Sequence, residues 1–383
     1  MDKPTVQDIF HRFYPAYLDQ YSPSPVQAKV AHNIMNCKTG AYGANVCVCE
    51  DCGFVQIHYN PCRNRCCPMC QAVPKEMWMD ARREDVLDAP YFHLVFTVPD
   101  ILNPVIYSNQ RLLYDALYHA ASSTISELTA DPKHLGAKVG YICILHTWGS
   151  EMNFHPHIHT ILLGGGLASN NQWKDNGENF FLPIRVISKM FRGKYLEELK
   201  RLWEEDKLVF HGTAEKFRNH YTFKELLDSC YGMDWIPHCK KTFNGAQTVI
   251  KYLGKYTHRI AVSNHRIVRM DDDTVTFLVK DYRNEGQWKE LTISGVEFVR
   301  RFLMHVPPRR FVRIRHYGLL CSRTKSQKLT LCRNLLGCKK YLSKLRDMEM
   351  PEILEHLYGI KVCVCKACGG HLGKPQMRMP LRC

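Results

Sequence analysis

The sequence predicts an α+β fold, in which a central antiparallel sheet flanked by helices follows a cysteine-rich N-terminal domain and precedes a basic C-terminal region. Three observations lead to this expectation. Eight of the 18 cysteines fall between Cys37 and Cys70. In the middle of the chain, short apolar runs bounded by turn residues alternate with helical patterns. Basic residues are concentrated from Arg300 to Arg323. The expected domains are residues 1–85, 86–265 and 266–383.

The chain carries a large excess of positive charge. Of its 383 residues, 52 are Lys or Arg and 37 are Asp or Glu, which gives a formal net charge of +15. Such an excess attracts polyanions at long range, and nucleic acid is the commonest of these. The charge says nothing of sequence specificity, because phosphate contacts carry none.

The sequence contains no run of about 18 apolar residues, so we expect no transmembrane helix. The segment Met1–Gln20 carries acids and aromatics in place of an apolar signal core. We therefore expect a protein that is not exported, has no membrane partner and stays in the cytoplasm. In a reducing compartment, clustered cysteines bind metals more often than they form disulfides.

Two Cys-x-x-Cys motifs in the N-terminal domain predict a structural zinc site. Fourteen residues separate Cys49-x-x-Cys52 from Cys67-x-x-Cys70. Each motif turns so that both thiolates face one ion, and zinc accepts four thiolates in a tetrahedral arrangement. We expect these four cysteines to share one Zn²⁺.

The remaining cysteines leave the number of zinc ions open between one and three. Four of them have irregular spacing and could form a second site: Cys37, Cys47, Cys62 and Cys66. His32 is an alternative ligand there. Near the C-terminus, Cys365-x-x-Cys368 is followed by two glycines, which is typical of a zinc knuckle. His371 or Cys383 could complete such a third site.

Apolar patterns place the elements of the central domain. Strands are expected at residues 91–98, 139–146 and 158–163. About ten residues separate the second and third strands, so an antiparallel hairpin is the simplest connection. Helices are expected at residues 75–87, 109–128, 248–259 and through most of 188–230. Further strands are expected at residues 265–291, around an acidic turn.

The third of these strands carries the residues most typical of a catalytic metal site. His157 and His159 are two residues apart, so their side chains emerge on one face and one ion can bind a nitrogen of each. His146 ends the partner strand and could reach the same ion, or it could be a hydrogen-bonded strand-end histidine. A metal there would act as a Lewis acid on a phosphate. His155 precedes a bend at Pro156, and we expect it beside the ligands or against DNA.

Tyr252 and Tyr256 are four residues apart in an expected helix and share one face. Alone, such a pair is more typical of helix packing. Beside a metal-bound phosphate, two phenols are candidate nucleophiles. The phenol pKa of about 10 must effectively fall as the new bond forms. Lys255 and Arg259, together with the metal, could supply the positive field.

Together these residues resemble the HUH nucleases, in which two histidines flank a hydrophobic residue. The closest resemblance is to the two-tyrosine rolling-circle transposases of the insertion-sequence 91 family, over roughly residues 25–325. The resemblance implies an HUH endonuclease domain. The matching segments, in the order of the family, are Cys62–Cys70, Phe92–Pro99, His146–Gly149, His155–His159, Tyr252–Tyr256 and Phe311–Gly318.

Two points of comparison with these families leave the ligands of a second zinc ion and of the catalytic metal undecided. The family usually has histidine where Asn45 and Cys66 stand, which puts the ligands of a second zinc in doubt. Other HUH transposases take the third catalytic-metal ligand from a glutamine or another residue. Gln247 and His258 therefore remain alternatives to His146.

The resemblance also implies a mechanism. Mg²⁺ or Mn²⁺ is held by two histidines and a third ligand, and one tyrosine attacks a phosphate at an element end. The products are a 5′-phosphotyrosine and a free 3′-hydroxyl, and no ATP is needed. The zinc domain and the basic region are expected to hold single-stranded or hairpin DNA. The expected DNA contacts are Arg63, Arg65, Arg259, Arg313 and Arg315.

Two other functions remain open at this point. A replication initiator or relaxase would use the same chemistry, but the segment Arg313–Gly318 and the N-terminal zinc domain favour a transposase. A zinc-ribbon DNA-binding protein without catalysis would use the histidines structurally.

Overall fold

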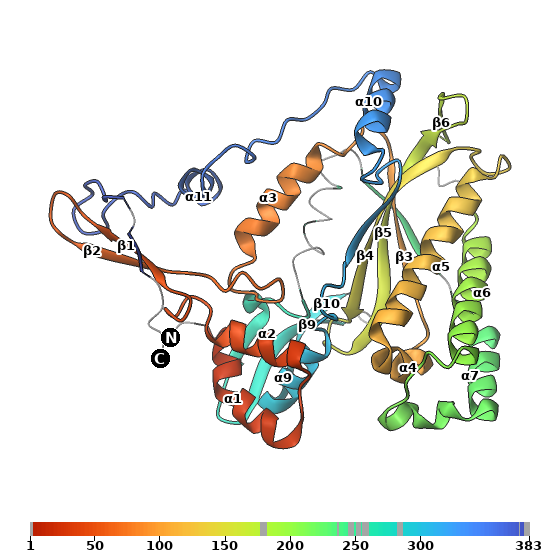
Figure 1. The fold of residues 1–383 in the computed structure, drawn as a ribbon, viewed down its shortest axis with the longest axis horizontal. Coiled ribbons are helices and arrows are strands. Elements are labelled where there is room, and N and C mark those ends of the chain that lie inside the picture. The colour runs from red at the N-terminus through yellow and green to blue at the C-terminus, as the bar shows by residue number, and fades with distance from the viewer. Residues whose placement is uncertain are drawn as a thin grey trace.

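The structure is a computed structural model that describes residues 3–176, 182–235, 237–243, 249, 254, 260–281, 286–374 and 376–378. Figure 1 shows a central sheet flanked by helices, a smaller helical lobe beside it, and a ribbon of strands at the far end. The helices are α1 (Val6–Gln20), α2 (Pro25–Met35), α3 (Ala72–Arg83), α4 (Asn103–Ser108), α5 (Gln110–Ala130), α6 (Ile184–Glu204), α7 (His220–Gly232), α9 (Gly295–Met304), α10 (Lys325–Leu336) and α11 (Met350–Tyr358). The strands are β1 (Ala44–Val48), β2 (Val55–Tyr59), β3 (Tyr91–Thr97), β4 (Lys138–Trp148), β5 (Phe154–Leu167), β6 (Trp173–Asp175), β7 (His238–Phe243), β8 (Ile267–Met270), β9 (Thr274–Asp281), β10 (Gln287–Ser294), β11 (Ile314–Gly318) and β12 (Gln376–Arg378).

The central sheet has the strand order β11-β4-β5-β3-β7, and β6 pairs with the end of β5. All of its described pairings are antiparallel. The sequence-based prediction of an α+β fold around an antiparallel sheet is therefore confirmed, and so is the hairpin formed by β4 and β5. Successive side chains of a strand point to opposite faces, so the two faces of this sheet differ in character.

Helices α5 and α6 cover one face of the central sheet (Figure 1). Phe92, Leu94 and Phe96 of β3 point to this face at alternate positions and are fully buried. Ile158 and Leu162 of β5 join them in the same core. Each such side chain contributes about 1.5–3 kcal/mol when it is removed from water. This face is the main hydrophobic core of the molecule.

The opposite face carries a smaller apolar layer. Ile142, Ile144 and Ile161 pack there with Met79 of α3 and Leu329 of α10. The face becomes polar toward the turn of the β4–β5 hairpin, where the histidines lie. The main core thus supports the sheet on the face covered by α5 and α6, and the histidines lie on the opposite face.

A second lobe contains α1, α2, α9 and the antiparallel sheet β10-β9-β8. Its core joins Phe10 and Phe13 of α1 to Phe298 and Phe302 of α9. The lobe therefore combines segments from near the start of the chain with segments beyond residue 260. The expected domain boundaries at residues 85 and 265 do not describe this shared core.

The first part of residues 1–85 consists of the helices α1 and α2, and the cysteine-rich part follows them. Thr5 and Ser24 begin α1 and α2 with capping boxes, in which each side chain accepts from the backbone of Asp8 or Gln27. This pattern is a recognised start signal for helices. Thr5 and Ser24 therefore mark helix starts that can be recognised in the sequence.

The third unit is a small ribbon in which β1 pairs with both β2 and the C-terminal strand β12. The chain reaches it from α10 by passing along α3 (Figure 1). Asp80 of α3 accepts hydrogen bonds from the Tyr341 and Ser343 hydroxyls and from the Leu345 amide. Burial opposes the charge of Asp80, but these three donors outweigh it and hold the pKa of this carboxyl below its usual range.

No helix in the described part of the chain combines the length and the apolar character that crossing a membrane requires.

Gly318, at the end of β11, tests how tightly this strand is held against β4. Its φ is +62°, and a Cβ there would lie 1.8 Å from the Val139 carbonyl oxygen. We expect Gly318→Ala to lower the free energy of unfolding by roughly 2–4 kcal/mol, from backbone strain and a clash that only a strand shift can relieve. Gly193 in α6 has open space around its Cα, so Gly193→Ala should stabilise by about 0.5–1 kcal/mol. Denaturant unfolding of both variants measures the change in the free energy of unfolding, which should be negative for Gly318→Ala and positive for Gly193→Ala. Equal changes in the two variants would contradict the close approach of Gly318 to the Val139 carbonyl oxygen.

Candidate metal centres and their surroundings

Three histidines meet on the polar end of the central sheet. In the β4–β5 hairpin, His146 pairs directly with His157, and Ile144 pairs with His159. Paired residues of an antiparallel ladder share a face, and so do residues two apart. The ligand nitrogens of the three histidines consequently lie within 4.8 Å of one another. The hairpin brings together the three residues named from the sequence.

The geometry of the histidine pair suits one ion. His157 Nε2 and His159 Nε2 lie 3.0 Å apart. Two nitrogens about 2.1 Å from a common ion, at about 90° to each other, are separated by this distance. His157 Nδ1 donates to the His155 carbonyl oxygen at 2.6 Å, which leaves the lone pair on Nε2, the atom facing His159.

Burial favours the neutral form of the His157 and His159 rings, and an imidazole must be neutral to bind a metal ion. Burial lowers the pKa of His157 to about 4. Burial and the neighbouring histidines lower the pKa of His159 well below its usual value. The donor set, three imidazoles without a carboxylate among the described residues, fits a divalent ion with positions left for water and phosphate oxygens.

His93 of β3 is a fourth member of the cluster that sequence reasoning did not single out. Its Nε2 lies 2.9 Å from His159 Nδ1, and the two rings are stacked with centroids 5.1 Å apart. His93 sits two residues from Val95, which pairs with His159, so the register alone could have identified it. A hydrogen bond to the second nitrogen of a ligand histidine fixes the tautomer and orientation of its ring.

Residues of the second lobe contact the turn that joins β4 to β5. His305, at the end of α9, bridges Thr147 Oγ1 at 3.1 Å and the Met152 carbonyl oxygen at 2.9 Å. Arg301 donates to the Glu151 carbonyl oxygen and Arg266 to that of Ser150. Trp148 stacks on the His146 ring with centroids 4.5 Å apart. The second lobe thus fixes the end of the hairpin that carries His146 and His157.

His155 lies at the margin of this cluster. Its Nδ1 is 3.2 Å from an Asp100 carboxylate oxygen, and the His155 side chain is 38% exposed. It is not among the three histidines that converge. The expectation that His155 lies beside the ligands or against DNA stays a prediction.

The expected nucleophiles and several neighbours lie outside the described residues: Gln247, Tyr252, Lys255, Tyr256, His258 and Arg259. Two residues within the same stretch are described. Val249 is buried in the apolar layer with Met79 of α3. Gly254 lies so close to α3 that a Cβ on it would come 2.0 Å from the Met79 sulfur. These two positions are therefore packed against α3.

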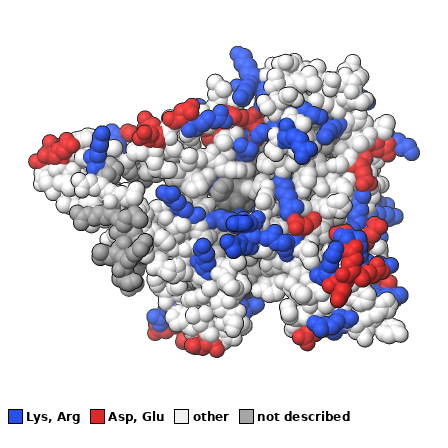
Figure 2. Space-filling model, viewed as in Figure 1, with Lys and Arg blue, Asp and Glu red and all other residues white. Residues whose placement is uncertain are grey.

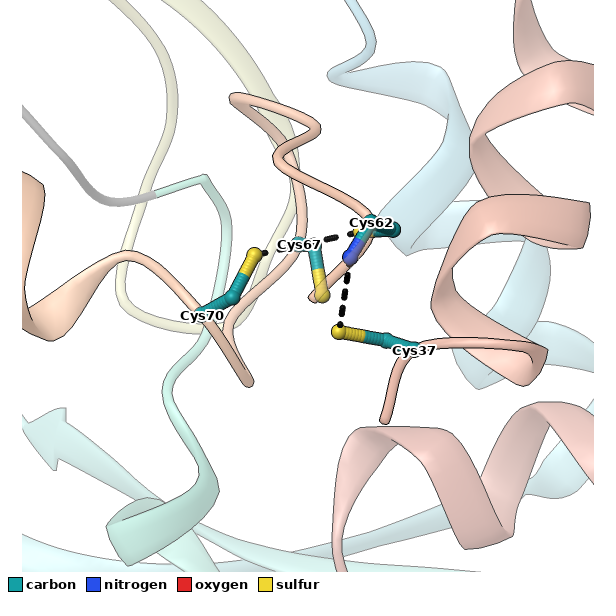
Figure 3. A group of neighbouring side chains, drawn as sticks. All are labelled: Cys37, Cys62, Cys67 and Cys70. Atoms are coloured by element: carbon teal, nitrogen blue, oxygen red, sulfur yellow. Dashed lines mark hydrogen bonds between the residues drawn. The ribbon is translucent and has the colours of Figure 1, made fainter. Parts of the chain in front are cut away.

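The cysteines form two quartets, and the grouping differs from the one the sequence suggests. Figure 3 shows Cys37, Cys62, Cys67 and Cys70 converging from the end of α2 and the loop before α3. The second quartet is Cys49, Cys52, Cys365 and Cys368. The expectation that Cys49 and Cys52 share an ion with Cys67 and Cys70 is wrong, because the β1–β2 hairpin carries the first pair away from the second.

The first quartet has the dimensions of a tetrahedral zinc site. Zinc about 2.3 Å from four thiolates sets the sulfurs about 3.8 Å apart, and the Cys62 and Cys70 sulfurs are 3.8 Å apart. Hydrogen bonds from the Cys62 and Cys67 thiols lower the pKa of Cys70. Hydrogen bonds with Cys62 and Cys70 raise the pKa of Cys67, so the cluster favours one thiolate, at Cys70, and a bound metal ion would displace the remaining thiol protons.

Cys47 and Cys66, expected in a second zinc site, belong to neither quartet. Cys47 is buried in the small core of the ribbon, and Cys66 is buried in the second lobe. His32 is exposed, and Asn36 Nδ2 lies 3.2 Å from its Nδ1. His371 lies on the surface with its ring 3.5 Å from a Glu50 carboxylate oxygen.

The arginines expected to contact DNA have different surroundings. The Arg315 guanidinium lies 3.9 Å from the centre of the Tyr118 ring and pairs with Asp115, so it supports β11. Arg65 donates to the carbonyl oxygens of residues 308 and 311. Burial lowers the pKa of Arg313. Arg63 and Arg65 are both exposed on the loop that carries the first quartet.

A basic pocket of about 320 Å³ opens beside that loop. Its lining includes Lys29 of α2 together with Arg65, Arg309 and Arg310. Figure 2 shows Lys and Arg side chains gathered around the hollow in the middle of the molecule, while acidic side chains lie mostly toward the periphery. This face has the charge and the concavity that suit a polyanion.

Comparison with known proteins identifies two family matches. The family described as "Transposase zinc-binding domain" matches residues 9–98, and the family described as "Putative transposase" matches residues 140–328. The first match and the cysteine quartets together support structural zinc.

Two curated relatives align over most of the chain. "Putative transposase y4qJ" of Sinorhizobium fredii (strain NBRC 101917 / NGR234) is 40% identical, over 95% of this chain and 93% of the relative. The "Transposase for insertion sequence element IS801" of Pseudomonas savastanoi pv. phaseolicola is 30% identical, over 79% and 72%. A structure of the conjugative relaxase TrwC with oriT DNA aligns over 43% of this chain and 71% of that chain at 12% identity, with a TM-score of 0.25, which is too low to support an argument.

The grouping of the cysteines generates a test. Cys37→Ser should remove one zinc per chain and lower the melting temperature markedly, because a bound structural zinc adds its binding free energy to folding. Cys47→Ser changes a cysteine that is buried to a similar degree but lies outside both quartets, so it should keep the zinc content. Metal analysis of the purified proteins checks both, and an equal loss of zinc from the two variants would contradict the quartet.

Proposed function

The chain belongs to the IS91 family of transposases, and from this premise we propose that it cleaves and rejoins single-stranded DNA through 5′-phosphotyrosine intermediates. The observation that carries the proposal is the histidine triad on the β4–β5 hairpin, whose ring nitrogens converge within 4.8 Å on one face of the sheet. A divalent ion held there, Mg²⁺ or Mn²⁺, would supply Lewis-acid charge to the scissile phosphate.

His146, His157 and His159 are the ligands in this proposal, and His93 orients the ring of His159. The neutral state of the buried rings favours this role, since a protonated imidazole has no lone pair to offer. Trp148 and His305 keep His146 and the hairpin turn in place. The ligands therefore need little reorganisation when the ion binds, which favours both affinity and a defined substrate orientation.

Tyr252 and Tyr256 are the proposed nucleophiles. The phenol oxygen of one tyrosine forms a bond to phosphorus as the bond from phosphorus to the 3′-oxygen breaks. The phenol proton is lost and the leaving 3′-oxygen gains one, so the products are a 5′-phosphotyrosine and a 3′-hydroxyl. Lys255 and Arg259, close in sequence, would favour the phenolate. The reverse reaction with another 3′-hydroxyl rejoins DNA without an energy source.

Two tyrosines allow two covalent linkages at once, one to the donor strand and one to a second strand. This supports a rolling-circle type of transposition over a single nicking event. The basic face around the central hollow (Figure 2) and the pocket at Lys29, Arg309 and Arg310 would bind the backbone of single-stranded or hairpin ends. Arg63, exposed on the adjoining loop, extends this surface.

A covalent adduct tests the proposed chemistry. The protein is incubated with labelled single-stranded oligonucleotides from the ends of its own element and with Mg²⁺ or Mn²⁺. We expect an SDS-resistant protein–DNA adduct, its absence with chelator, and its absence from the double variant Tyr252→Phe, Tyr256→Phe. Tyr221→Phe, at a tyrosine that is 76% exposed on α7, is the matched control and should form the adduct normally. If the double variant still forms it, the nucleophile assignment fails.

The position of His93 generates a second test. His93→Leu removes the partner of His159 Nδ1, so metal affinity should fall about 10- to 100-fold. His93→Gln, which can still reach that nitrogen, should recover part of the loss. Titration of Mn²⁺ followed by its electron paramagnetic resonance signal measures affinity without DNA. His119→Gln, at an exposed histidine of α5, is the control, and an unchanged affinity in His93→Leu would exclude the orienting role.

A further inference from the structure

Two similar turns from opposite ends of the chain face each other in the ribbon. One is Cys49-Glu-Asp-Cys52-Gly53 and the other is Cys365-Lys-Ala-Cys368-Gly369. In each, the glycine amide donates to the carbonyl oxygen of the first cysteine, at 3.0 Å for Gly53 and 2.9 Å for Gly369. Both glycines have left-handed φ values, +72° and +78°. The two turns are therefore the same structure, a zinc knuckle, formed twice.

The sulfur atoms of these turns lie at zinc-site distances. The Cys49 sulfur is 3.5 Å from that of Cys368, and the two residues are 319 positions apart in the chain. The Cys52 sulfur is 3.8 Å from that of Cys365. All four sulfurs lie within 4.8 Å of one another, close to the edge of about 3.8 Å that a zinc–thiolate tetrahedron requires.

Backbone amides support negative charge on the sulfurs. The Ala367 amide donates to the Cys365 sulfur, and the Gly370 amide donates to the Cys368 sulfur, each at 3.4 Å. Such amides stabilise a thiolate relative to a thiol. The cysteines of the C-terminal knuckle are therefore arranged as ligands and not merely as buried apolar side chains.

The surrounding contacts are too few to hold this unit by themselves. The hydrophobic core of the ribbon consists of Cys47, Cys49, Cys365 and Leu372 among the described residues. Among the described residues, the two segments are joined by three paired positions between β12 and β1 and by two backbone hydrogen bonds, from the Glu50 amide to the His371 carbonyl oxygen and from the Gly373 amide to the Val48 carbonyl oxygen. The side chains of Asp51 and Glu50 add exposed contacts with His371. Units with so small a core usually need a metal or disulfide to fold.

We propose that Cys49, Cys52, Cys365 and Cys368 bind one zinc ion that joins the two ends of the chain and holds β12 in the ribbon. The family match to a zinc-binding domain covers residues 9–98, so half of these ligands lie outside it. The ion closes a loop of polypeptide that is also attached to α3 through Asp80. Zinc fits because it is redox-inert, and four thiolates satisfy it completely.

Zinc content of the full-length protein tests the ligand set. Cys365→Ser combined with Cys368→Ser should lower the zinc by one ion per chain, and Cys49→Ser combined with Cys52→Ser should cause the same loss. Combining all four changes should remove no further ion. Cys363→Ser is the matched control, because this exposed cysteine lies in the same segment but outside the quartet. Losses of two ions in the fourfold variant would mean separate sites and would overturn the proposal.

A nicked protein tests the joining role directly. A protease recognition sequence is inserted at Gly359, which ends α11 in an exposed position, and the full chain is purified and then cut. The C-terminal fragment should co-elute with the rest of the protein in gel filtration and should be released by a zinc chelator. The variant with Cys365→Ser and Cys368→Ser should lose the fragment without chelator. Retention of the fragment in that variant, or after zinc removal, would show that the strand contacts suffice and would refute the zinc-dependent joint.

Discussion

The arrangement of the candidate active site depends on the register of one hairpin. Direct pairing of His146 with His157 places three imidazoles on the same face of the sheet. A slip of β5 by one residue would turn His157 and His159 into the main core and Ile158 to the opposite face of the sheet. Burial of Ile158 and Leu145 behind the sheet therefore specifies the register as strongly as any polar contact.

The second lobe adds a constraint at the turn of this hairpin. Its groups engage successive residues of the turn, through the guanidinium of Arg266, the guanidinium of Arg301 and the ring of His305. That lobe also contains the Cys37 quartet in its core. Loss of the first zinc would consequently disturb α1 and α2, and through α9 the disturbance would reach the hairpin that carries the three histidines. The structural zinc site and the candidate catalytic metal site are thus connected through the packing of the second lobe.

The sequence predicts local features of this protein better than the partners of those features. Alternation identified β3, β4 and β5, and a separation of about ten residues identified the hairpin. The two cysteines of each Cys-x-x-Cys motif lie in the same quartet, since such a turn is a local structure. Cysteine spacing could not show that the partner of Cys49 is Cys368, because that choice depends on where the chain returns after α10. His93 was overlooked for a related reason, since its role follows from pairing across strands.

The two cysteine quartets differ in when they can form during synthesis. All ligands of the first lie within the first 70 residues, so it can close while most of the chain is still being made. The second needs Cys368, which is synthesised 319 positions after Cys49. Contacts so distant in sequence form late and slowly. Chains that stop before Cys368 therefore cannot form the joint, even though the ligands of their first quartet are all present.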